Sequence, residues 1–261
     1  MARVATLFSS SKGNAIYVGS SSAGVLIDAG ASCKKIFTAL ELCGISLNAV
    51  KAVFVTHEHS DHVKGLKVLQ KQTGLPIYAS NGTLEYLIHN DLLFCENELY
   101  TVNCPVCAAG MEITAFKTPH DSAESVGYTI STEDGRKISV CTDLGEVTET
   151  VRENVLGSDL CVLEANYDEQ MLAHNSVYPP YLKKRIASGK GHLSNSDSAL
   201  TARELIDSGT TRIVLGHLSQ NNNTPQKAME TVLGKLGEYK VGKDYLMTVA
   251  PVATVGQTIV L

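Results

Sequence analysis

Short runs of β-branched and apolar residues alternate along this chain with stretches whose apolar positions have helical spacing. Continuous apolar runs bounded by turn residues are typical of buried strands, and apolar positions three and four apart are typical of helices that cover a sheet. The expected strands span residues 4–8, 15–18, 25–28, 49–55, 76–79, 99–102, 111–117, 125–131, 137–141, 159–164, 212–215, 245–249 and 258–261. The expected helices span residues 34–42, 63–72, 82–90, 146–155, 180–187, 196–207 and 225–236.

Turn residues support these boundaries. Gly44 and Gly74 follow the first two expected helices, where a residue in the left-handed conformation commonly ends a helix. The segment Glu133-Asp134-Gly135 separates two expected strands and favours a hairpin. Both halves of the chain run from strands to helices, and no low-complexity linker divides them. We therefore predict an α/β protein in which two sheets pack together with helices outside, as a single domain over residues 1–261.

The composition agrees with this interpretation and also indicates where in the cell the protein is found. The chain has 261 residues with 44% apolar content, which is enough for a sizeable core. Its apolar runs are too short to cross a bilayer, and its N-terminus, MARVATLFSSSKGNAIYV, lacks the apolar stretch of a signal peptide. We therefore expect a cytoplasmic protein without membrane association. Seven cysteines, an odd number, favour reduced thiols, and we interpret Cys104 and Cys107 as half-buried thiols in a turn.

The charge of the chain bears on its partners. The net charge of −5 argues against a broad basic surface for nucleic acids but leaves room for a locally basic groove. Lys183, Lys184, Arg185 and Lys190 form the one basic concentration in the sequence. They are interpreted either as a solvated helix face or as a track for a phosphate backbone. No particular protein partner is indicated.

The segment FVTHEHSDHVKG, residues 54–65, concentrates potential metal ligands between an expected strand and an expected helix. In an extended segment, residues two apart point the same way, so His57 and His59 can hold one ion. Asp61 and His62 would begin the following helix and can face a second ion. Imidazoles with one carboxylate suit Zn²⁺, Mn²⁺ or Fe better than Ca²⁺ or Mg²⁺. The segment therefore predicts a transition-metal site.

Other polar residues follow apolar runs in the same manner. Taken singly, a strand-end Asp is more typical of a helix cap, and a lone His is more typical of the surface. Together with the histidine cluster, they indicate a site with more than one metal, because strand ends of a layered α/β fold meet at one edge. These residues are Asp28, His120, Asp143, His192 and His217.

The motifs taken together resemble a known family. HxHxDH followed by separate His, Asp and His residues is similar to the metallo-β-lactamase superfamily. The resemblance to its YycJ/WalJ-like branch covers nearly the whole chain, through LIDAG, THEHSDHVKG, TPHDS, GYTI, TDLG, EANYDEQML, YPPYLKKRI, GHLSN and LGHLSQNNNTP. HxHxDH identifies only the superfamily, whereas GHLSN and LGHLSQNN are narrower. One departure is SSSKGN, where the branch more usually has an SGSSGN-like turn.

The resemblance implies a four-layer αββα sandwich of two mixed sheets with helices on the outer faces, and two divalent metal ions, Zn, Mn or Fe. Asp28 would hydrogen-bond the HxHxDH loop, and His192 would stay unligated and face the substrate. One ion would be held by His57, His59 and His120, and the other by Asp61, His62 and His217, with Asp143 bridging the two.

The resemblance also implies an activity, that of a metal-dependent phosphodiesterase acting as a 5′ to 3′ exonuclease on double-stranded DNA. A hydroxide shared by the two ions would attack phosphorus, with Asp61 and His192 as catalytic residues. Ser194, Lys184 and Arg185 are candidate substrate contacts, although Ser194 is also placed to cap the next helix. Two alternatives stay open: a hydrolase of small cyclic phosphodiesters or thioesters, and a regulatory protein that keeps the metals only for folding.

Overall fold

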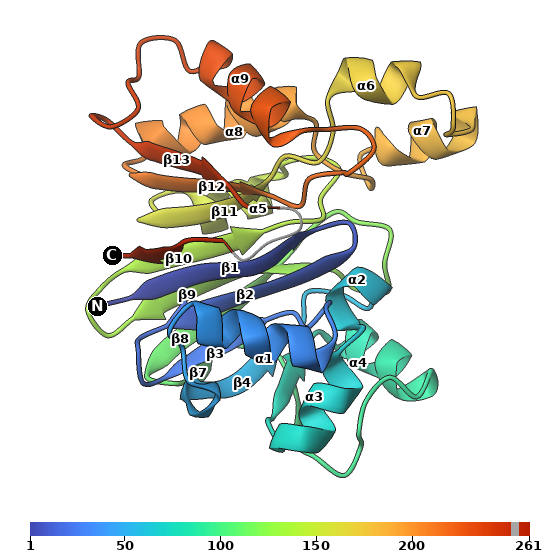
Figure 1. Cartoon of the computed structure of the whole chain (residues 1–261), viewed down its shortest axis with the longest axis vertical. Helices are drawn as coiled ribbons and strands as arrows, with labels where there is room; N and C mark the ends of the chain where they lie inside the picture. Colours follow the sequence, from blue (N-terminus) through green and yellow to red (C-terminus); the bar gives the residue numbers. More distant parts are fainter. Residues whose placement is uncertain (252–255) are drawn as a thin grey trace.

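The computed structural model describes residues 1–251 and 256–261 and arranges its strands in two seven-stranded sheets (Figure 1). The first sheet has the order β14-β1-β2-β3-β4-β5-β6 and the second the order β13-β12-β11-β10-β9-β8-β7. The first comprises β1 (Arg3–Ser10), β2 (Gly13–Gly19), β3 (Gly24–Ile27), β4 (Val50–Phe54), β5 (Ile77–Ala79), β6 (Leu99–Thr101) and β14 (Thr258–Val260). The second comprises β7 (Val106–Ala108), β8 (Met111–Lys117), β9 (Val126–Thr132), β10 (Lys137–Cys141), β11 (Leu160–Glu164), β12 (Arg212–Gly216) and β13 (Leu246–Val249). Both sheets are mixed, since each contains antiparallel and parallel pairs.

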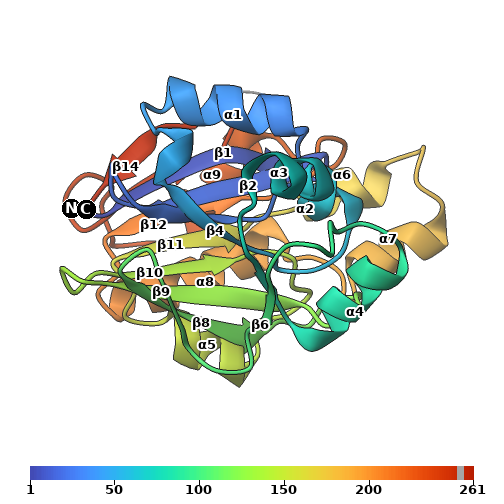
Figure 2. The same ribbon diagram turned by 90° about the horizontal axis from the view of Figure 1, so that it is seen from below.

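Helices follow the strands in both halves of the chain. Those of the first half are α1 (Cys33–Leu42), α2 (Ser60–Val63), α3 (Leu66–Thr73) and α4 (Asn81–His89), with a 3₁₀ turn at Leu47–Ala49. Those of the second half are α5 (Glu149–Val155), α6 (Glu169–His174), α7 (Pro180–Ile186), α8 (Asn195–Asp207) and α9 (Pro225–Lys235). Figure 2 shows α1 on the outer side of the first sheet and α5 on the outer side of the second. The two sheets therefore lie between helices.

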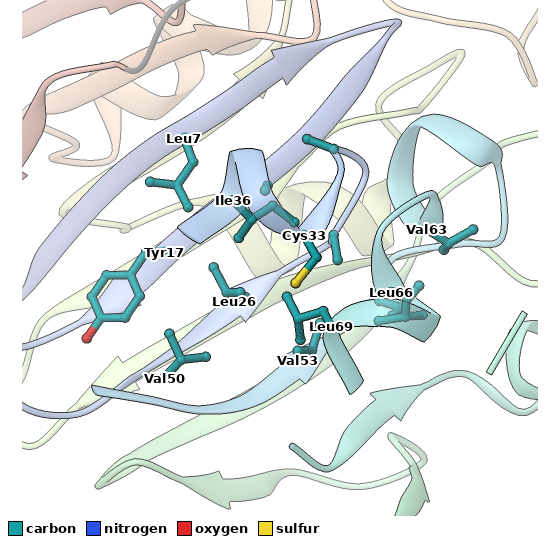
Figure 3. Packing of buried hydrophobic residues seen from close by; sticks show 14 of the residues in the cluster. Leu7, Tyr17, Leu26, Cys33, Ile36, Val50, Val53, Val63, Leu66 and Leu69 are labelled. Atoms are coloured by element: carbon teal, nitrogen blue, oxygen red, sulfur yellow. The ribbon is translucent and has the colours of Figure 1, made fainter. Parts of the chain in front are cut away.

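Alternation along the strands distributes apolar side chains among three buried layers. On β3 and β4, Val25 and Phe54 face the second sheet, where they join a cluster that includes Tyr128. Their neighbours Leu26 and Val53 face the other way and pack beneath α1 and α3 (Figure 3). Such alternation follows from the two-residue period of a strand. A third cluster, on the outer face of the second sheet, packs against α5, α8 and α9. These three apolar layers lie between helices, sheet, sheet and helices. This is the four-layer αββα order that the resemblance implies.

Three short elements differ from the sequence prediction. The expected helix over 63–72 begins only at Leu66, and the short helix α2 precedes it, because the chain turns at Gly65, whose N–H donates to the Ala29 carbonyl at 2.8 Å. A Cβ at Gly65 would lie only 2.0 Å from the Ala31 carbonyl oxygen, so this approach requires glycine. The helix α6 and the edge strand β7 were not predicted. Since β7 lies at an edge, Cys107 within it and Cys104 just before it are exposed rather than half-buried.

The cysteines are free thiols, as their odd number predicts. Cys161 lies in β11 and is fully buried, and burial raises the pKa of its thiol to about 12. It is therefore a packing residue rather than a reactive one. Among the described helices, none combines the length and the apolar composition needed to span a membrane.

Candidate metal centre

Polar side chains from both sheets gather at the edge where several strands end. Asp28 directly follows β3, His57 and His59 lie between β4 and α2, and Asp143 lies just beyond β10. His217 directly follows β12, so the second sheet contributes at the same edge. The pairs β3–β4, β10–β11 and β11–β12 are parallel, which brings the carboxyl ends of these strands together. The side chains that the sequence places at separate strand ends are therefore neighbours in space.

The backbone is strained at three of these positions. Asp28, Asp143 and His217 have φ angles of 65°, 59° and 54°, in the left-handed region that non-glycine residues seldom adopt. Each such residue costs of the order of 1–3 kcal/mol and persists only where its surroundings hold it. Three of them at one sheet edge are typical of a site whose geometry is kept for function rather than for stability.

His57, His59 and His120 form the first group of potential ligands, with one ligand atom of each within 4.8 Å of the others. Nδ1 of His120 donates to the Gly191 carbonyl at 2.9 Å, so its Nε2 keeps a free lone pair. That Nε2 lies 3.3 Å from Nδ1 of His59. Nε2 of His57 is buried and has no hydrogen-bond partner among the described residues. The three side chains therefore bring these nitrogens as close together as the ligands of one metal ion.

Asp61, His62 and His217 form a second group within the same distance limit. His217 Nε2 lies 3.3 Å from Asp61 Oδ2. The Asp143 carboxylate lies between the two groups, with Oδ2 at 3.2 Å from His62 Nε2, and it forms a further group with His57 and His62. Asp143 is thus placed beside both groups.

The electrostatics of this edge favour a bound cation. Burial alone would lower the pKa of His62, yet the surrounding carboxylates of Asp143, Asp28 and Asp61 raise it well above its usual value. Burial, and next the charge of His62, lowers the pKa of His57 well below its usual value, so its imidazole is neutral, the form that binds metals. Burial alone would raise the pKa of Asp143, but the histidines, His217 first, hold it well below its usual value.

The residues present fit divalent transition-metal ions. Imidazole nitrogens and carboxylate oxygens are their usual donors. Two buried ligand atoms, His57 Nε2 and Asp143 Oδ2, make no hydrogen bond to any described residue, although Asp143 Oδ2 lies near His62 Nε2. A buried polar atom without a hydrogen bond is costly unless something binds it. A bound cation between the two groups would satisfy both atoms.

Asp28 lies behind these groups rather than among them. Its Oδ1 accepts the Thr56 N–H at 2.8 Å, and its Oδ2 accepts the His62 Nδ1–H at 2.8 Å. This second bond turns Nε2 of His62 toward Asp61 and Asp143. A carboxylate on the far nitrogen of a histidine ligand is the usual means of orienting that ligand.

Glu164 is a residue that the sequence analysis missed. It ends β11, is fully buried, and its Oε1 accepts from Nδ1 of both His192 and His217, at 2.8 Å and 2.9 Å. Its Oε2 accepts the backbone N–H groups of Leu144 and Leu193. Asp143, Glu164, His192 and His217 also form a group within 4.8 Å, but Glu164 Oε1 is already shared between the two imidazoles. The available signal was an acid ending the apolar run LCVLE, the same pattern that singled out the other residues.

His192 and the three proposed substrate contacts lie on the side of His120. His192 has 22% of its side chain exposed, and its ring centroid lies 5.1 Å from that of His120. Lys184 and Arg185 are exposed on α7, and Arg185 pairs with Asp121 next to His120. Ser194 is different: it is 2% exposed, and its Oγ accepts the Asp197 N–H as the N-cap of α8. The capping role therefore holds, and the Ser194 side chain is not available to a substrate.

Comparison with known proteins agrees with this architecture. The sequence profile described as the Beta-lactamase superfamily domain matches residues 24–218. Exodeoxyribonuclease YycJ of Bacillus anthracis is 36% identical over 239 residues, which cover 90% of this chain and 89% of that protein. Exodeoxyribonuclease WalJ of Streptococcus pneumoniae serotype 2 is 32% identical over 240 residues, covering 90% of this chain and 88% of that protein. The crystal structure of Zn²⁺-bound PqqB from Methylobacterium extorquens superposes with a TM-score of 0.74 at 18% identity, covering 99% of this chain and 100% of that one.

Two mixed sheets between helices, with a histidine- and carboxylate-lined edge, define a metallo-β-lactamase-fold protein. The chain belongs to the β-lactamase superfamily domain family, and within it to the proteins that resemble YycJ and WalJ. The resemblance and the fold class drawn from the sequence are both confirmed.

Proposed function

We propose that this protein is a metal-dependent phosphodiesterase that degrades DNA as an exonuclease. The observation that carries the proposal is the hydrogen bond between His192 and the buried carboxylate of Glu164, beside two groups of potential metal ligands. A site that binds metals only for folding has no need of such an additional imidazole. The names of YycJ and WalJ, both exodeoxyribonucleases, support DNA as the substrate.

The ligand assignment follows the observed groups. His57, His59 and His120 would hold one divalent ion, and Asp61, His62 and His217 a second, with Asp143 between them. Bound there, the ions would activate water and neutralise negative charge on the phosphoryl oxygens. Asp61, whose side chain is 21% exposed, would also orient the attacking water. Zn, Mn and Fe all suit this donor set.

His192 would act on the leaving oxygen. The Glu164 carboxylate accepts from its Nδ1 and stabilises the protonated imidazole, so Nε2 is free to donate a proton. The backbone N–H of His192 donates to the Ile186 carbonyl at the end of α7, which holds the residue against that helix. Lys184 and Arg185 of α7 would then contact the DNA backbone near His192. Cleavage from a 5′ end of double-stranded DNA is proposed on the resemblance to the YycJ/WalJ-like branch.

One assay separates this function from its alternatives. Purified holoprotein is given 5′-labelled duplex DNA, an aryl phosphodiester and a thioester, each with Mn²⁺ or Zn²⁺. Degradation of the duplex supports the proposal. Hydrolysis of the small esters with an intact duplex would replace it with a small-molecule hydrolase, and bound metal without any hydrolysis would favour a regulatory protein.

Two histidine variants test the assigned roles. His192→Ala should keep the metal content and lose most turnover, because His192 would move a proton without binding metal. His217→Ala should lower the metal content itself, as measured by elemental analysis. His89→Ala, at an exposed position that ends α4, is the matched control and should change neither. A His192→Ala enzyme with nearly full rate would remove His192 from the mechanism.

The extent and location of the protein belong to the same proposal. We propose that residues 1–261 form one domain, since the middle apolar cluster contains side chains of both sheets. We also propose a cytoplasmic location.

A further inference from the structure

A cavity of about 450 Å³ lies beside the proposed metal centre and is lined by three lysines from three separate segments. Lys12 lies in the turn between β1 and β2, Lys35 in the first turn of α1, and Lys64 at the end of α2. Figure 1 shows the β1–β2 turn next to α2. We call this space, with Lys12, Lys35 and Lys64 on its walls, the lysine cavity. Its volume is within the usual range for small-molecule binding sites, about 300–1,000 Å³.

The charge of the lysine cavity is not neutralised by the protein. Elsewhere on the surface, Lys67 pairs with Asp91, and Lys117 with Glu124. Lys12, Lys35 and Lys64 form no ion pair with any of the residues that the structure describes. No described Asp or Glu lines the cavity either. Three unpaired cations around one concave space attract an anion.

Neutral donors complete the lining. Ser10, Ser32 and Gln220 lie on the walls, and the Ser32 side chain makes no capping bond to α1, which it precedes. Hydroxyl and amide groups beside lysines are the side chains that commonly contact phosphate oxygens. The lining therefore suits a phosphate group better than an apolar ligand.

The cavity shares a wall with the metal centre. Its lining residue Gly30 donates its N–H to the Asn14 carbonyl at 2.7 Å, and a Cβ at Gly30 would lie 1.6 Å from the Asp61 carbonyl oxygen. Nδ2 of Asn14 lies 3.3 Å from Asp61 Oδ2 and 3.0 Å from His62 Nε2. One residue layer thus separates the lysine cavity from two of the proposed metal ligands.

We propose that the lysine cavity binds a phosphate group of the DNA strand adjacent to the phosphodiester held at the metal centre. The inference rests on the proposed nuclease function, because it assumes that the strand carries further phosphates. It adds a second anchoring point for the DNA backbone on the Asp61 side of the centre, whereas Lys184 and Arg185 would contact the backbone on the His192 side. The bound phosphate is either an internal one or the terminal 5′-phosphate.

The test measures DNA binding by the holoprotein. A triple variant, K12Q/K35Q/K64Q, removes the three charges from the cavity. The matched control, K51Q/K235Q/K243Q, removes three exposed lysine charges at the start of β4, the end of α9 and the approach to β13, away from the strand-end edge. Fluorescence anisotropy gives the Kd for a duplex with phosphorothioate linkages at its 5′ ends, which limits hydrolysis. Thermal unfolding and metal content show whether both variants keep the fold.

The cavity variant should bind the duplex about tenfold more weakly than the wild type, as expected for three partly exposed charge contacts. Its Kd should also depend less steeply on salt, with a log–log slope smaller by about one. The control should stay within twofold of the wild type. An unchanged Kd in the cavity variant, or an equal loss in the control, would overturn the inference.

Two further arms identify the phosphate and separate this inference from the proposed function. If the lysine-dependent gain in affinity requires a 5′-phosphorylated duplex, the cavity takes the terminal phosphate. If a 5′-hydroxyl duplex shows the same gain, it takes an internal one. Turnover of an unmodified duplex is recorded in parallel. If the wild type binds DNA through the three lysines but leaves it intact, the proposed nuclease function is contradicted and the phosphate site in the lysine cavity is supported. If the wild type cleaves DNA but its binding does not depend on the lysines, the nuclease function is supported and the phosphate site is contradicted.

Discussion

Glu164 shows how much one buried carboxylate does at the residue scale. A buried charge is costly, and here two imidazoles and two backbone N–H groups offset that cost. Because both His192 and His217 bond to it through Nδ1, each presents Nε2 to the edge of the sheets. Glu164 thereby couples a proposed ligand to the proposed proton donor.

Glu164→Gln should lower the rate on an aryl phosphodiester by about 10- to 100-fold, the usual loss when an orienting group behind a metal site is removed. The amide cannot accept two N–H groups on one oxygen as strongly, because it lacks the negative charge. Steady-state rates and elemental analysis measure the effect. Glu96→Gln, at an exposed position, should leave both unchanged. Full activity and full metal content in Glu164→Gln would contradict the role described.

At the scale of elements, tight loops after the strands place the site. The segment after β3 contacts the loop after β4 through main-chain bonds: Ala29 donates to His62 O, and Gly65 donates to Ala29 O, both at 2.8 Å. Such close contact leaves no space for a side chain at Gly30. The position of Asp61 therefore depends on a glycine in a neighbouring loop.

Gly30→Ala should displace the Asp61 loop and lower metal content, since its Cβ would lie 1.6 Å from the Asp61 carbonyl oxygen and 2.6 Å from the Asn14 nitrogen. The free energy of unfolding should fall by more than about 1 kcal/mol. Gly234→Ala is the control: it lies in α9 with nothing within 4 Å of the added Cβ, so it should be neutral or slightly stabilising. Urea unfolding and elemental analysis measure both effects. A Gly30→Ala protein with wild-type metal content and stability would show that the loop can move freely.

Another carboxylate joins elements at the opposite end of the second sheet. Asp159 precedes β11, and its side chain accepts from the Lys137 N–H at 2.9 Å and from Arg136 at 2.7 Å. Partial burial alone would raise the pKa of Asp159, but these hydrogen bonds and the Arg136 charge lower it overall. The folded state therefore favours the ionised carboxylate more than the unfolded chain does.

Asp159→Asn should destabilise the protein by about 1 kcal/mol at pH 7, since one partly exposed charged acceptor is lost. A lowered folded-state pKa stabilises above the unfolded value of about 3.9, and this contribution is lost as pH falls through the folded value. The difference between wild type and variant should therefore be constant from pH 7 to 5 and shrink below about pH 4. Urea unfolding at several pH values measures it. A difference that persists unchanged at pH 3 would exclude the ionised carboxylate as its cause.

At the scale of the whole molecule, the proposed metal centre joins the two sheets. His57, His59, Asp61 and His62 follow a strand of the first sheet, while His120, Asp143 and His217 follow strands of the second. Metal ions bound by both sets would connect two halves that also pack together through the apolar layer between the sheets. Metal binding and folding should thus be coupled.

Removal of metal by a chelator should lower the melting temperature by about 5–10 °C. This follows from about 2.7 kcal/mol of stabilisation at a metal concentration 100 times the Kd, and from 2–4 °C per kcal/mol for a chain of this size. Differential scanning calorimetry before and after dialysis measures the shift, and added Mn²⁺ or Zn²⁺ should restore it. His217→Ala, with fewer ligands, should show a smaller shift. An unchanged melting temperature after proven metal loss would separate the site from stability.

The long elements of the fold could be predicted from the sequence because their pattern is local. Expected strands such as 137–141 and the helix over 34–42 agree with the structure within a residue, since apolar period and turn residues lie within each segment. The short elements α6 and β7 and the break at Gly65 could not be predicted. Gly65 ends α2 because its N–H bonds to Ala29, a contact 36 residues away in the sequence that no local pattern records.

The sequence by itself determined the family, the layer order and which residue types follow the strands, because short motifs and local patterns are sufficient to indicate each of these. Only the tertiary structure decided which of those residues meet. It assigned Glu164 to His192 and His217, committed Ser194 to a helix cap, and brought three lysines from distant segments around one cavity. The physical reason is that periodicity acts between neighbours in the chain, whereas hydrogen bonds and charge act between neighbours in space.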